Sequence, residues 1–321
     1  MSRSRTLEGH SDGVTSIAIS SDGTKVFTGS QDKTVCIWDV DTGNLSYILE
    51  GHSKSVVSIA VSSDGSKLFT GSYDKTVRIW DLNGGQELRV VDGHSGYVTA
   101  INVSSDGKRL FTASDDCTAR IWDVKSGQLL QTLEGHSDRV YSIAVLSDGR
   151  KAFTGSHDKT GRIWDVESGQ LLRTLEGHSY GVISIAVSSD GMKVFTGSED
   201  RTARIWDVEN GQLLRTLEGH SSGVTSIAIS TDGKKVFTGS YDNTCRIWDV
   251  ESGELLETFE GGDKALQLRA RFPALDQFFA GFDVNDVGYT QDPPPSYNLL
   301  DRQGSLLFQT RGNLFECWNL V

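Results

Sequence analysis

Short hydrophobic runs alternate with polar, glycine-containing turns along most of the chain, and segment 170–207 shows the pattern clearly. Its apolar and β-branched runs predict four short strands. These strands are expected at Leu171–Leu175, Val182–Val187, Lys193–Ser198 and Ala203–Trp206. Asp190-Gly191 stands between the second and third runs, and this pair is a strong hairpin signal because glycine accepts a positive φ at little cost. The unit predicts antiparallel β-structure and shows no helical period.

The same unit recurs with a fixed period of 42 residues, marked by a Gly-His pair and a Trp-Asp pair in each copy. The Gly-His pairs are Gly9-His10, Gly51-His52, Gly93-His94, Gly135-His136, Gly177-His178 and Gly219-His220. The Trp-Asp pairs are Trp38-Asp39, Trp80-Asp81, Trp122-Asp123, Trp164-Asp165, Trp206-Asp207 and Trp248-Asp249. A period in this range marks a repeat architecture, and four-stranded units arranged around one axis form a β-propeller. The predicted fold class is therefore all-β, with four-stranded antiparallel blades.

The Gly-His pair, the Ser-x-Asp-x-Thr turn and the Ile-Trp-Asp ending, at these spacings, resemble WD40 repeats over residues 1–260. The resemblance implies that residues 1–321 form a single WD40 β-propeller with six regular repeats to about residue 260. The N-terminal strand at 3–7 supplies one further outer strand, so we expect seven blades in a ring closed by that strand. Ring closure would remove an exposed sheet edge that otherwise invites aggregation.

Residues 261–321 predict a divergent seventh blade with an insertion. Gly261-Gly262 replaces the Gly-His pair, and Trp318 lies 56 residues after Gly262, against 28 at the same place in the other copies. If the repeat is counted forward from Gly262, residues 277–282 align with the third strand of the unit. If it is counted backward from Trp318, residues 305–310 align with that strand instead, and both alignments stay open. The surplus at 283–304 contains three consecutive prolines, which cannot lie inside a sheet. We expect a surface loop there, with partner docking as a hypothesis.

Each copy also brings together a histidine, an aspartate and a threonine, the chemical types of a nucleophilic triad. A hydrolase needs one activated hydroxyl at one cleft, whereas six equivalent sets recur here. The resemblance implies that these groups and the repeat tryptophan form a hydrogen-bonded tetrad inside each blade, with Ser30 as an alternative to Thr28 in the first. The predicted tetrads are His10, Thr28, Asp32 and Trp38; His52, Thr70, Asp74 and Trp80; His94, Thr112, Asp116 and Trp122; His136, Thr154, Asp158 and Trp164; His178, Thr196, Asp200 and Trp206; and His220, Thr238, Asp242 and Trp248. We therefore expect no catalytic residues and no enzyme activity.

Positions at which the copies differ are better candidates for function. Three phases vary strongly: the third and fifth residues after the repeat histidine, and the residue before the turn aspartate. The resemblance implies that these phases lie on the top face around the central channel, where peptides dock. The candidate binding residues, richest in blades two to four, are Tyr73, Tyr97, Asp115, Arg139, Tyr141, His157, Glu199 and Tyr241. Tyrosine and arginine are enriched at binding hot spots, and the nearby carboxylates favour an Arg- or Lys-bearing peptide. Variation without function is the alternative, because loop tips tolerate substitution.

Composition excludes several function classes. A net charge of −12 argues against non-specific nucleic-acid binding, which needs a basic surface. Four cysteines without a Cys-x-x-Cys pair indicate neither a disulfide framework nor a zinc site, and favour a cytoplasmic or nuclear location. No apolar run is long enough to predict a membrane span. We expect no metal and no cofactor.

The predicted function is therefore a non-catalytic scaffold or adaptor that binds protein or peptide partners and is monomeric on its own. Two alternatives stay open. One is a sensor or regulatory domain of a larger multidomain signalling protein, of innate-immune or apoptotic type, because the chain begins and ends at the expected ring closure. The other is an amplified or designed array without a specific ligand, because the copies are so alike.

Overall fold

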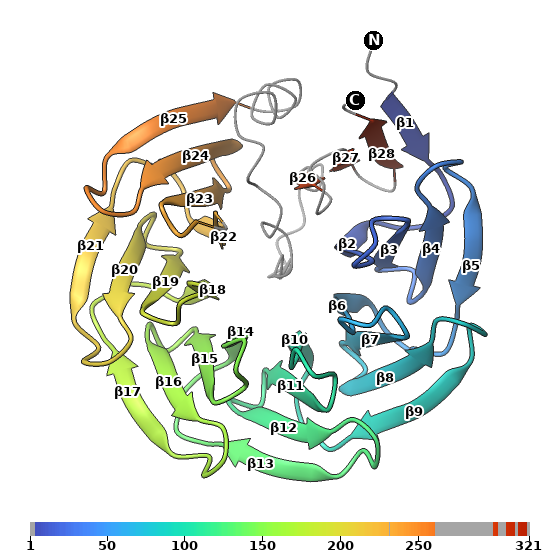
Figure 1. The fold of residues 1–321 in the computed structure, drawn as a ribbon, viewed down its shortest axis with the longest axis horizontal. Coiled ribbons are helices and arrows are strands. Elements are labelled where there is room, and N and C mark those ends of the chain that lie inside the picture. The colour runs from blue at the N-terminus through green and yellow to red at the C-terminus, as the bar shows by residue number, and fades with distance from the viewer. Residues whose placement is uncertain (1–3, 231, 261–297, 301–305, 312–313, 320–321) are drawn as a thin grey trace.

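The computed structural model describes residues 4–230, 232–260, 298–300, 306–311 and 314–319, with side chains described over 7–230 and 232–259. All regular secondary structure in these ranges is β-strand. Between residues 14 and 260 the strands form six four-stranded antiparallel sheets, which we number as blades one to six. Figure 1 shows these blades side by side around a common axis, with the first strand of each innermost and the fourth outermost. The prediction of an all-β array with one sheet per repeat is confirmed.

The strands of each blade are consecutive in the chain. From blade one to blade six they are β2 (Val14–Ile19), β3 (Lys25–Ser30), β4 (Val35–Asp39) and β5 (Leu45–Leu49); β6 (Val56–Val61), β7 (Lys67–Ser72), β8 (Thr76–Asp81) and β9 (Glu87–Asp92); β10 (Val98–Val103), β11 (Arg109–Ser114), β12 (Ala119–Asp123) and β13 (Leu129–Leu133); β14 (Val140–Val145), β15 (Lys151–Ser156), β16 (Gly161–Asp165) and β17 (Leu171–Leu175); β18 (Val182–Val187), β19 (Lys193–Ser198), β20 (Ala203–Asp207) and β21 (Leu213–Leu217); and β22 (Val224–Ile229), β23 (Lys235–Ser240), β24 (Thr244–Asp249) and β25 (Leu255–Glu260). In the hairpin between β18 and β19, Gly191 has a φ of 70°, as the Asp-Gly signal predicts.

Each blade is offset by one strand from the sequence unit. Segment 170–207 contains β17 to β20, but β17 pairs with β16 of blade four, and β18 to β20 take β21 as their outer strand. The connection from each outer strand to the next inner strand therefore links neighbouring blades covalently. The apolar pattern predicted the strands, whereas the offset depends on which strands pair.

The N-terminal strand pairs with the C-terminal end of the chain. Strands β1 (Ser4–Leu7), β28 (Leu314–Asn319), β27 (Leu306–Arg311) and β26 (Asn298–Leu300) form a further four-stranded sheet in that order. In the antiparallel pair of β1 and β28, Ser4 stands opposite Trp318. Strand β27 corresponds to the backward alignment at 305–310, and β26 falls within 283–304, where we expected only a loop. The forward alignment at 277–282 and the proline run lie outside the described residues.

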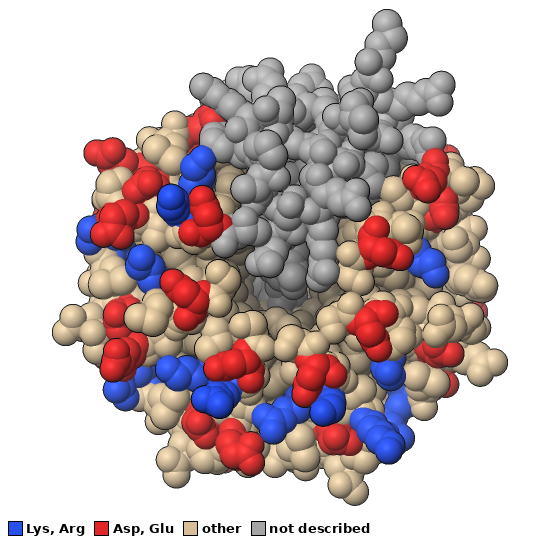
Figure 2. Space-filling view, in the orientation of Figure 1, with Lys and Arg blue, Asp and Glu red and all other residues tan. Residues whose placement is uncertain are grey.

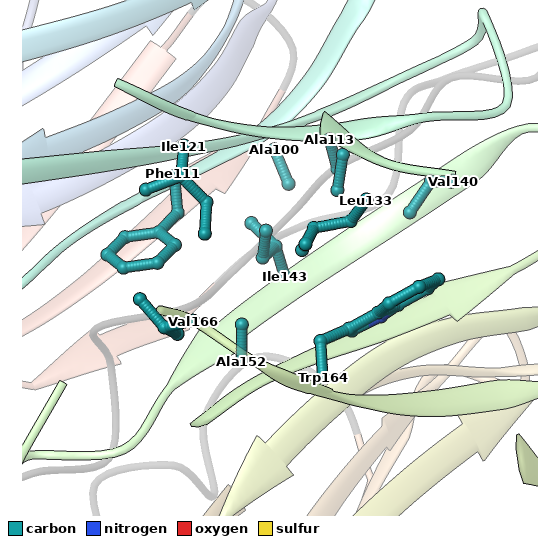
Figure 3. Close-up of a cluster of buried hydrophobic side chains, with 11 residues drawn as sticks. Ala100, Phe111, Ala113, Ile121, Leu133, Val140, Ile143, Ala152, Trp164 and Val166 are labelled. Atoms are coloured by element: carbon teal, nitrogen blue, oxygen red, sulfur yellow. The ribbon is translucent and has the colours of Figure 1, made fainter. Parts of the chain in front are cut away.

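The hydrophobic core lies between neighbouring blades. Figure 3 shows the cluster where Phe111, Ile121 and Leu133 of blade three meet Ile143 and Trp164 of blade four. Phe111 and Leu133 are fully buried, and Trp164 is 1% exposed. Equivalent clusters join the other successive pairs of blades. Because each blade buries its apolar faces only against its neighbours, stability is built from one interface after another, as in repeat proteins generally.

A β-bulge recurs at the start of every inner strand. The register between the first and second strands shifts by one residue, for example between Val140 and Ser142 in blade four, so Tyr141 is the extra residue. The same shift occurs in the other five blades. A bulge redirects the side chain that it carries. The bulge residue is the phase five after the repeat histidine, one of the three that vary most strongly.

Candidate functional site

Each of the six blades contains a buried chain of hydrogen bonds through a tryptophan, a threonine, a histidine and an aspartate. In blade five the Trp206 indole N–H donates to Thr196 Oγ1 at 2.7 Å, and the Thr196 hydroxyl bonds His178 Nε2 at 2.8 Å. The other ring nitrogen, Nδ1, bonds Asp200 Oδ2 at 2.7 Å. The same three bonds join His10, Thr28, Asp32 and Trp38; His52, Thr70, Asp74 and Trp80; His94, Thr112, Asp116 and Trp122; His136, Thr154, Asp158 and Trp164; and His220, Thr238, Asp242 and Trp248. Thr28 takes this place in blade one, while the Ser30 hydroxyl donates to the Asp12 carbonyl.

The tetrads hold a neutral imidazole against an ionised carboxylate. A carboxylate only accepts hydrogen bonds, so Nδ1 carries the proton and Nε2 accepts from the threonine hydroxyl. Burial lowers the pKa of His178 and His220, which favours this neutral form. Burial opposes ionisation of Asp242, but hydrogen bonds from Thr244, His220 and the backbone outweigh it and lower its pKa to about 2. The indole, hydroxyl, imidazole and carboxylate are therefore all partnered.

The order Thr–His–Asp is that of a nucleophilic triad, but the threonine hydroxyl is inaccessible. All six tetrad threonines are 0% exposed, namely Thr28, Thr70, Thr112, Thr154, Thr196 and Thr238. Each hydroxyl oxygen also accepts the indole N–H, so no substrate carbonyl can approach it. The tetrads are structural, and the site that varies between blades lies elsewhere.

In each blade, two of the varied phases are joined by a backbone hydrogen bond. The N–H of the residue before the turn aspartate donates to the carbonyl of the residue three after the repeat histidine, at 2.9 or 3.0 Å. We call these two residues the rim pair. The rim pairs are Gly13 and Gln31, Ser55 and Tyr73, Tyr97 and Asp115, Arg139 and His157, Gly181 and Glu199, and Gly223 and Tyr241. In every blade the rim pair lies at the same end as the Gly-His loop. We call this end of the blades the top face.

Side chains of neighbouring rim pairs contact one another across the blade boundaries. Tyr73 of blade two stacks on Tyr97 of blade three, with ring centroids 4.8 Å apart and an interplanar angle of 27°. Arg139 Nε of blade four lies 3.9 Å from Asp115 Oδ2 of blade three. His157 of blade four lies against Gly181 of blade five. The aromatic and charged candidates are thus brought together over adjacent blades.

His157 lies near two carboxylates of the top face, those of Asp138 and Glu199. Its Nδ1 is 2.8 Å from Asp138 Oδ2, and its Nε2 is 3.9 Å from Glu199 Oε2. The hydrogen bond with His157 is the main cause of the lowered pKa of Asp138. The ring of His157 also meets the Tyr141 ring edge-on, with centroids 5.7 Å apart. Tyr241 lies in blade six, where it is 46% exposed next to Gly223.

Tyr141 is buried beneath this face rather than exposed on it. Its side chain is only 4% exposed, and four of the other five bulge residues, Thr15, Val57, Thr99 and Ile183, are buried as well. The fifth, Thr225, is half-buried. Burial raises the pKa of the Tyr141 hydroxyl, which accepts a hydrogen bond from the Arg139 guanidinium. Arg139 and His157 are therefore exposed on the top face, and Tyr141 lies beneath them.

Sequence reasoning missed three side chains on this face. Lys54 Nζ lies 4.9 Å from the centroid of the Tyr97 ring, Asp138 pairs with His157, and Tyr180 is 60% exposed. All three occupy the phase two after the repeat histidine. That phase reads Asp12, Lys54, Gly96, Asp138, Tyr180 and Ser222 through the six blades. It varies as strongly as the phases we selected, so the same criterion would have found it.

On the face that Figure 2 shows, acidic side chains of the described blades lie towards the common axis, and several lysines and arginines lie further out. Within the described residues, no group of three or more His, Cys, Asp or Glu side chains is placed to hold a metal ion. The same part of the chain contains no helix long and apolar enough to cross a membrane.

Four-stranded blades, each fastened by its own tetrad and each bearing different residues at one end, define a repeat protein of the propeller class. The family model "WD domain, G-beta repeat" (WD40) matches residues 1–39, 43–81, 85–123, 127–165, 169–207 and 211–249. The chain therefore belongs to the WD40 family, whose members generally act as non-catalytic scaffolds for protein–protein interaction.

One curated relative is similar over a single repeat. A stretch of 39 residues is 54% identical to the vegetative incompatibility protein HET-E-1 of Podospora anserina. The matched stretch covers 12% of this chain and only 3% of that protein. The similarity therefore reflects shared repeat sequence and carries nothing about the rest of that protein.

Proposed function

We propose that this protein is a non-catalytic scaffold that binds a segment of a partner protein on its top face, over blades two to four with Glu199 of blade five at the border. The observation that carries the proposal is the contrast between the two sets of side chains. The tetrads recur in every blade and are internally satisfied, whereas Tyr97, Asp115 and Arg139 occur once at their phases and are joined across blades.

The electrostatics of Asp115 favour a ligand with basic side chains. Burial raises the pKa of Asp115, and the Arg139 charge offsets this only in part, while Asp116 and Asp138 raise it further. A cation placed beside the carboxylate would favour its ionised form. The neighbouring stacked pair, Tyr73 and Tyr97, offers aromatic rings to an arginine or lysine side chain.

The test uses a labelled peptide carrying two arginines separated by one glycine, with a glutamine-substituted peptide as reference. Fluorescence anisotropy should show that the arginine peptide binds wild-type protein more tightly. Tyr97→Ala and Asp115→Asn should each weaken binding about tenfold, as expected for hot-spot residues. Asp106→Asn is the matched control, because it removes the same charge from the turn between β10 and β11, at the opposite end of blade three. Equal binding by Asp115→Asn and Asp106→Asn would contradict the proposal.

We also propose that the sheet of β1, β28, β27 and β26 is a seventh blade that closes the ring. Support comes from the antiparallel pairing of β1 with β28, and from Leu7, which is 4% exposed and packs with Trp38 of blade one. Deleting residues 1–8 should lower the melting temperature and cause self-association, because it would expose a sheet edge. Leu7→Ala, which keeps the strand, measures the packing loss alone, about 2–5 kcal/mol. If the deletion leaves the melting temperature and the monomeric state unchanged, this closure is wrong.

The remaining features of the proposal follow from charge and composition. A net charge of −12 supports a protein partner rather than nucleic acid or an anionic membrane surface. Burial raises the pKa of the Cys36 thiol to about 12, so this thiol is unreactive. The four cysteines form no Cys-x-x-Cys pair, which supports a cytoplasmic or nuclear location. We propose that the protein is monomeric, and light scattering tests this directly.

A further inference from the structure

Two of the protein's own cations occupy the features that would recognise a basic ligand. Lys54 of blade two places its Nζ over the ring of Tyr97, 4.9 Å from the centroid. Arg139 of blade four places its guanidinium beside the carboxylate of Asp115, with Nε 3.9 Å from Oδ2. In the free protein, both the aromatic face and the carboxylate of blade three are therefore already in contact with a positive charge.

Neither contact belongs to the structural plan of the repeat. The phase of Lys54 holds Asp, Gly, Asp, Tyr and Ser in the other blades, and the phase of Arg139 holds Gly, Ser, Tyr, Gly and Gly. The structural arginines behave differently. Arg120, for example, lies over Trp122, donates to the Gly93 carbonyl, and has equivalents at Arg78, Arg162, Arg204 and Arg246. Lys54 and Arg139 are thus not required to build a blade.

Both contacts are also loose. A separation of 3.9 Å is beyond hydrogen-bonding distance, and the Arg139 side chain is 51% exposed. Lys54 is exposed too, and cation–π contacts at exposed sites are weak. Asp115, whose side chain is 19% exposed, has no other lysine, arginine or histidine within 4.0 Å among the described residues. An incoming guanidinium that reached hydrogen-bonding distance of Asp115 would form the stronger contact.

We propose that Lys54 and Arg139 are internal placeholders, which cover Tyr97 and Asp115 in the free protein and are displaced by two basic side chains of the ligand. This inference rests on the proposed function of the top face. It specifies a ligand segment with two basic groups, one for the aromatic ring and one for the carboxylate. It also makes Lys54 and Arg139 competitors that reduce affinity and so raise specificity for doubly basic segments.

The test measures binding of the two-arginine peptide to Lys54→Met and Arg139→Met. Methionine keeps the apolar stem and removes the charge. Each variant should bind the peptide about two- to fivefold more tightly than wild type, the equivalent of about 0.5–1 kcal/mol. Lys159→Met is the matched control, because it removes an exposed lysine from a turn on the same face in blade four and changes the net charge equally. Its affinity should change less than twofold.

The outcomes separate this inference from the proposed function. If Asp115→Asn loses binding but Arg139→Met gains no more than Lys159→Met, the placeholder role is wrong and the binding face stands. If Asp115→Asn binds as wild type does, the binding face itself is wrong. An acidic peptide that binds wild type and is lost in Arg139→Met would make Arg139 a ligand contact and overturn the inference. If neither wild type nor any variant binds the arginine peptide, both ideas fail.

Discussion

Replacing Thr196 with valine would remove one hydroxyl from the centre of the blade-five tetrad and keep the shape of the side chain. The Trp206 indole N–H and His178 Nε2 would both lose their partner. Thr196 is 0% exposed and His178 is 5% exposed, and valine fills the vacated volume, so water cannot replace the hydroxyl. The variant therefore isolates hydrogen bonding from packing.

The expected loss follows from the number of orphaned groups. Leaving a buried donor or acceptor unpaired costs about 1–3 kcal/mol. Two such groups predict that Thr196→Val lowers the free energy of unfolding by about 2–6 kcal/mol. Thr196→Ser keeps the hydroxyl and loses one methyl group, which lies near Gly161 of blade four, so it should lose only about 1 kcal/mol.

Urea unfolding followed by far-UV circular dichroism measures both variants. The control is Thr216→Val in β21 of the same blade, a half-buried threonine that makes no side-chain hydrogen bond among the described residues. Its stability should stay within about 0.5 kcal/mol of wild type. The reasoning is refuted if Thr196→Val matches this control. It is equally refuted if Thr196→Ser is more destabilising than Thr196→Val, because packing would then outweigh hydrogen bonding.

Two further predictions concern pH and backbone freedom. Burial lowers the pKa of His136 below its ordinary value of about 6.5, so the unfolded chain binds more protons than the folded protein as the pH falls. The urea concentration at the unfolding midpoint should therefore decrease when the pH is lowered from about 7.5 to about 5.5. The pKa of Asp242 is lowered to about 2, so stability should decrease a second time as the pH falls from about 4 to about 2. A urea midpoint that rises on acidification in either range contradicts the corresponding prediction. Gly161→Ala should raise the free energy of unfolding by about 0.5–1 kcal/mol, because Ala119 and Ala203 occupy the equivalent register in blades three and five. The Cβ of the new alanine would lie 3.2 Å from Leu175 Cδ1, which is a tight contact. An unchanged or lower urea midpoint would show that Leu175 does not move to relieve it.

Much of the fold could be predicted because each strand is a local pattern repeated many times. The expected strands at Leu171–Leu175, Val182–Val187 and Lys193–Ser198 coincide with β17, β18 and β19. The alternation of apolar and polar residues does not encode which strands pair, so it could not predict the one-strand offset of the blades. Only the resemblance to WD40 repeats implied that offset, because it makes 3–7 an outer strand without inner strands before it. The short strand β26 at Asn298–Leu300 escaped prediction because it lies in a segment without a counterpart in the other repeats.

Less of the candidate site could be predicted, because variation does not reveal burial. The rim pairs were found since the repeats provide a background against which Tyr97, Asp115 and Arg139 stand out. The repeat position of Tyr141 varies as strongly between the copies, but the bulge buries the Tyr141 side chain. No residue nearby in the sequence indicates that bulge. The contact between Lys54 and Tyr97 joins residues of different blades, so only the packing of blade two against blade three brings them together.

Two neighbouring carboxylates of blade three, Asp115 and Asp116, differ in how far the fold already satisfies them. Asp116 has an equivalent in each of the six repeats, and its hydrogen bonds with His94 and Thr118 outweigh burial and lower its pKa. Asp115 has no equivalent aspartate, burial raises its pKa, and Arg139 stands beyond hydrogen-bonding distance. A ligand directed at Asp116 would have to break bonds that the fold already makes. A cation that pairs with Asp115 instead gains free energy that the blade's own side chains do not supply, and for that reason the binding face is expected there.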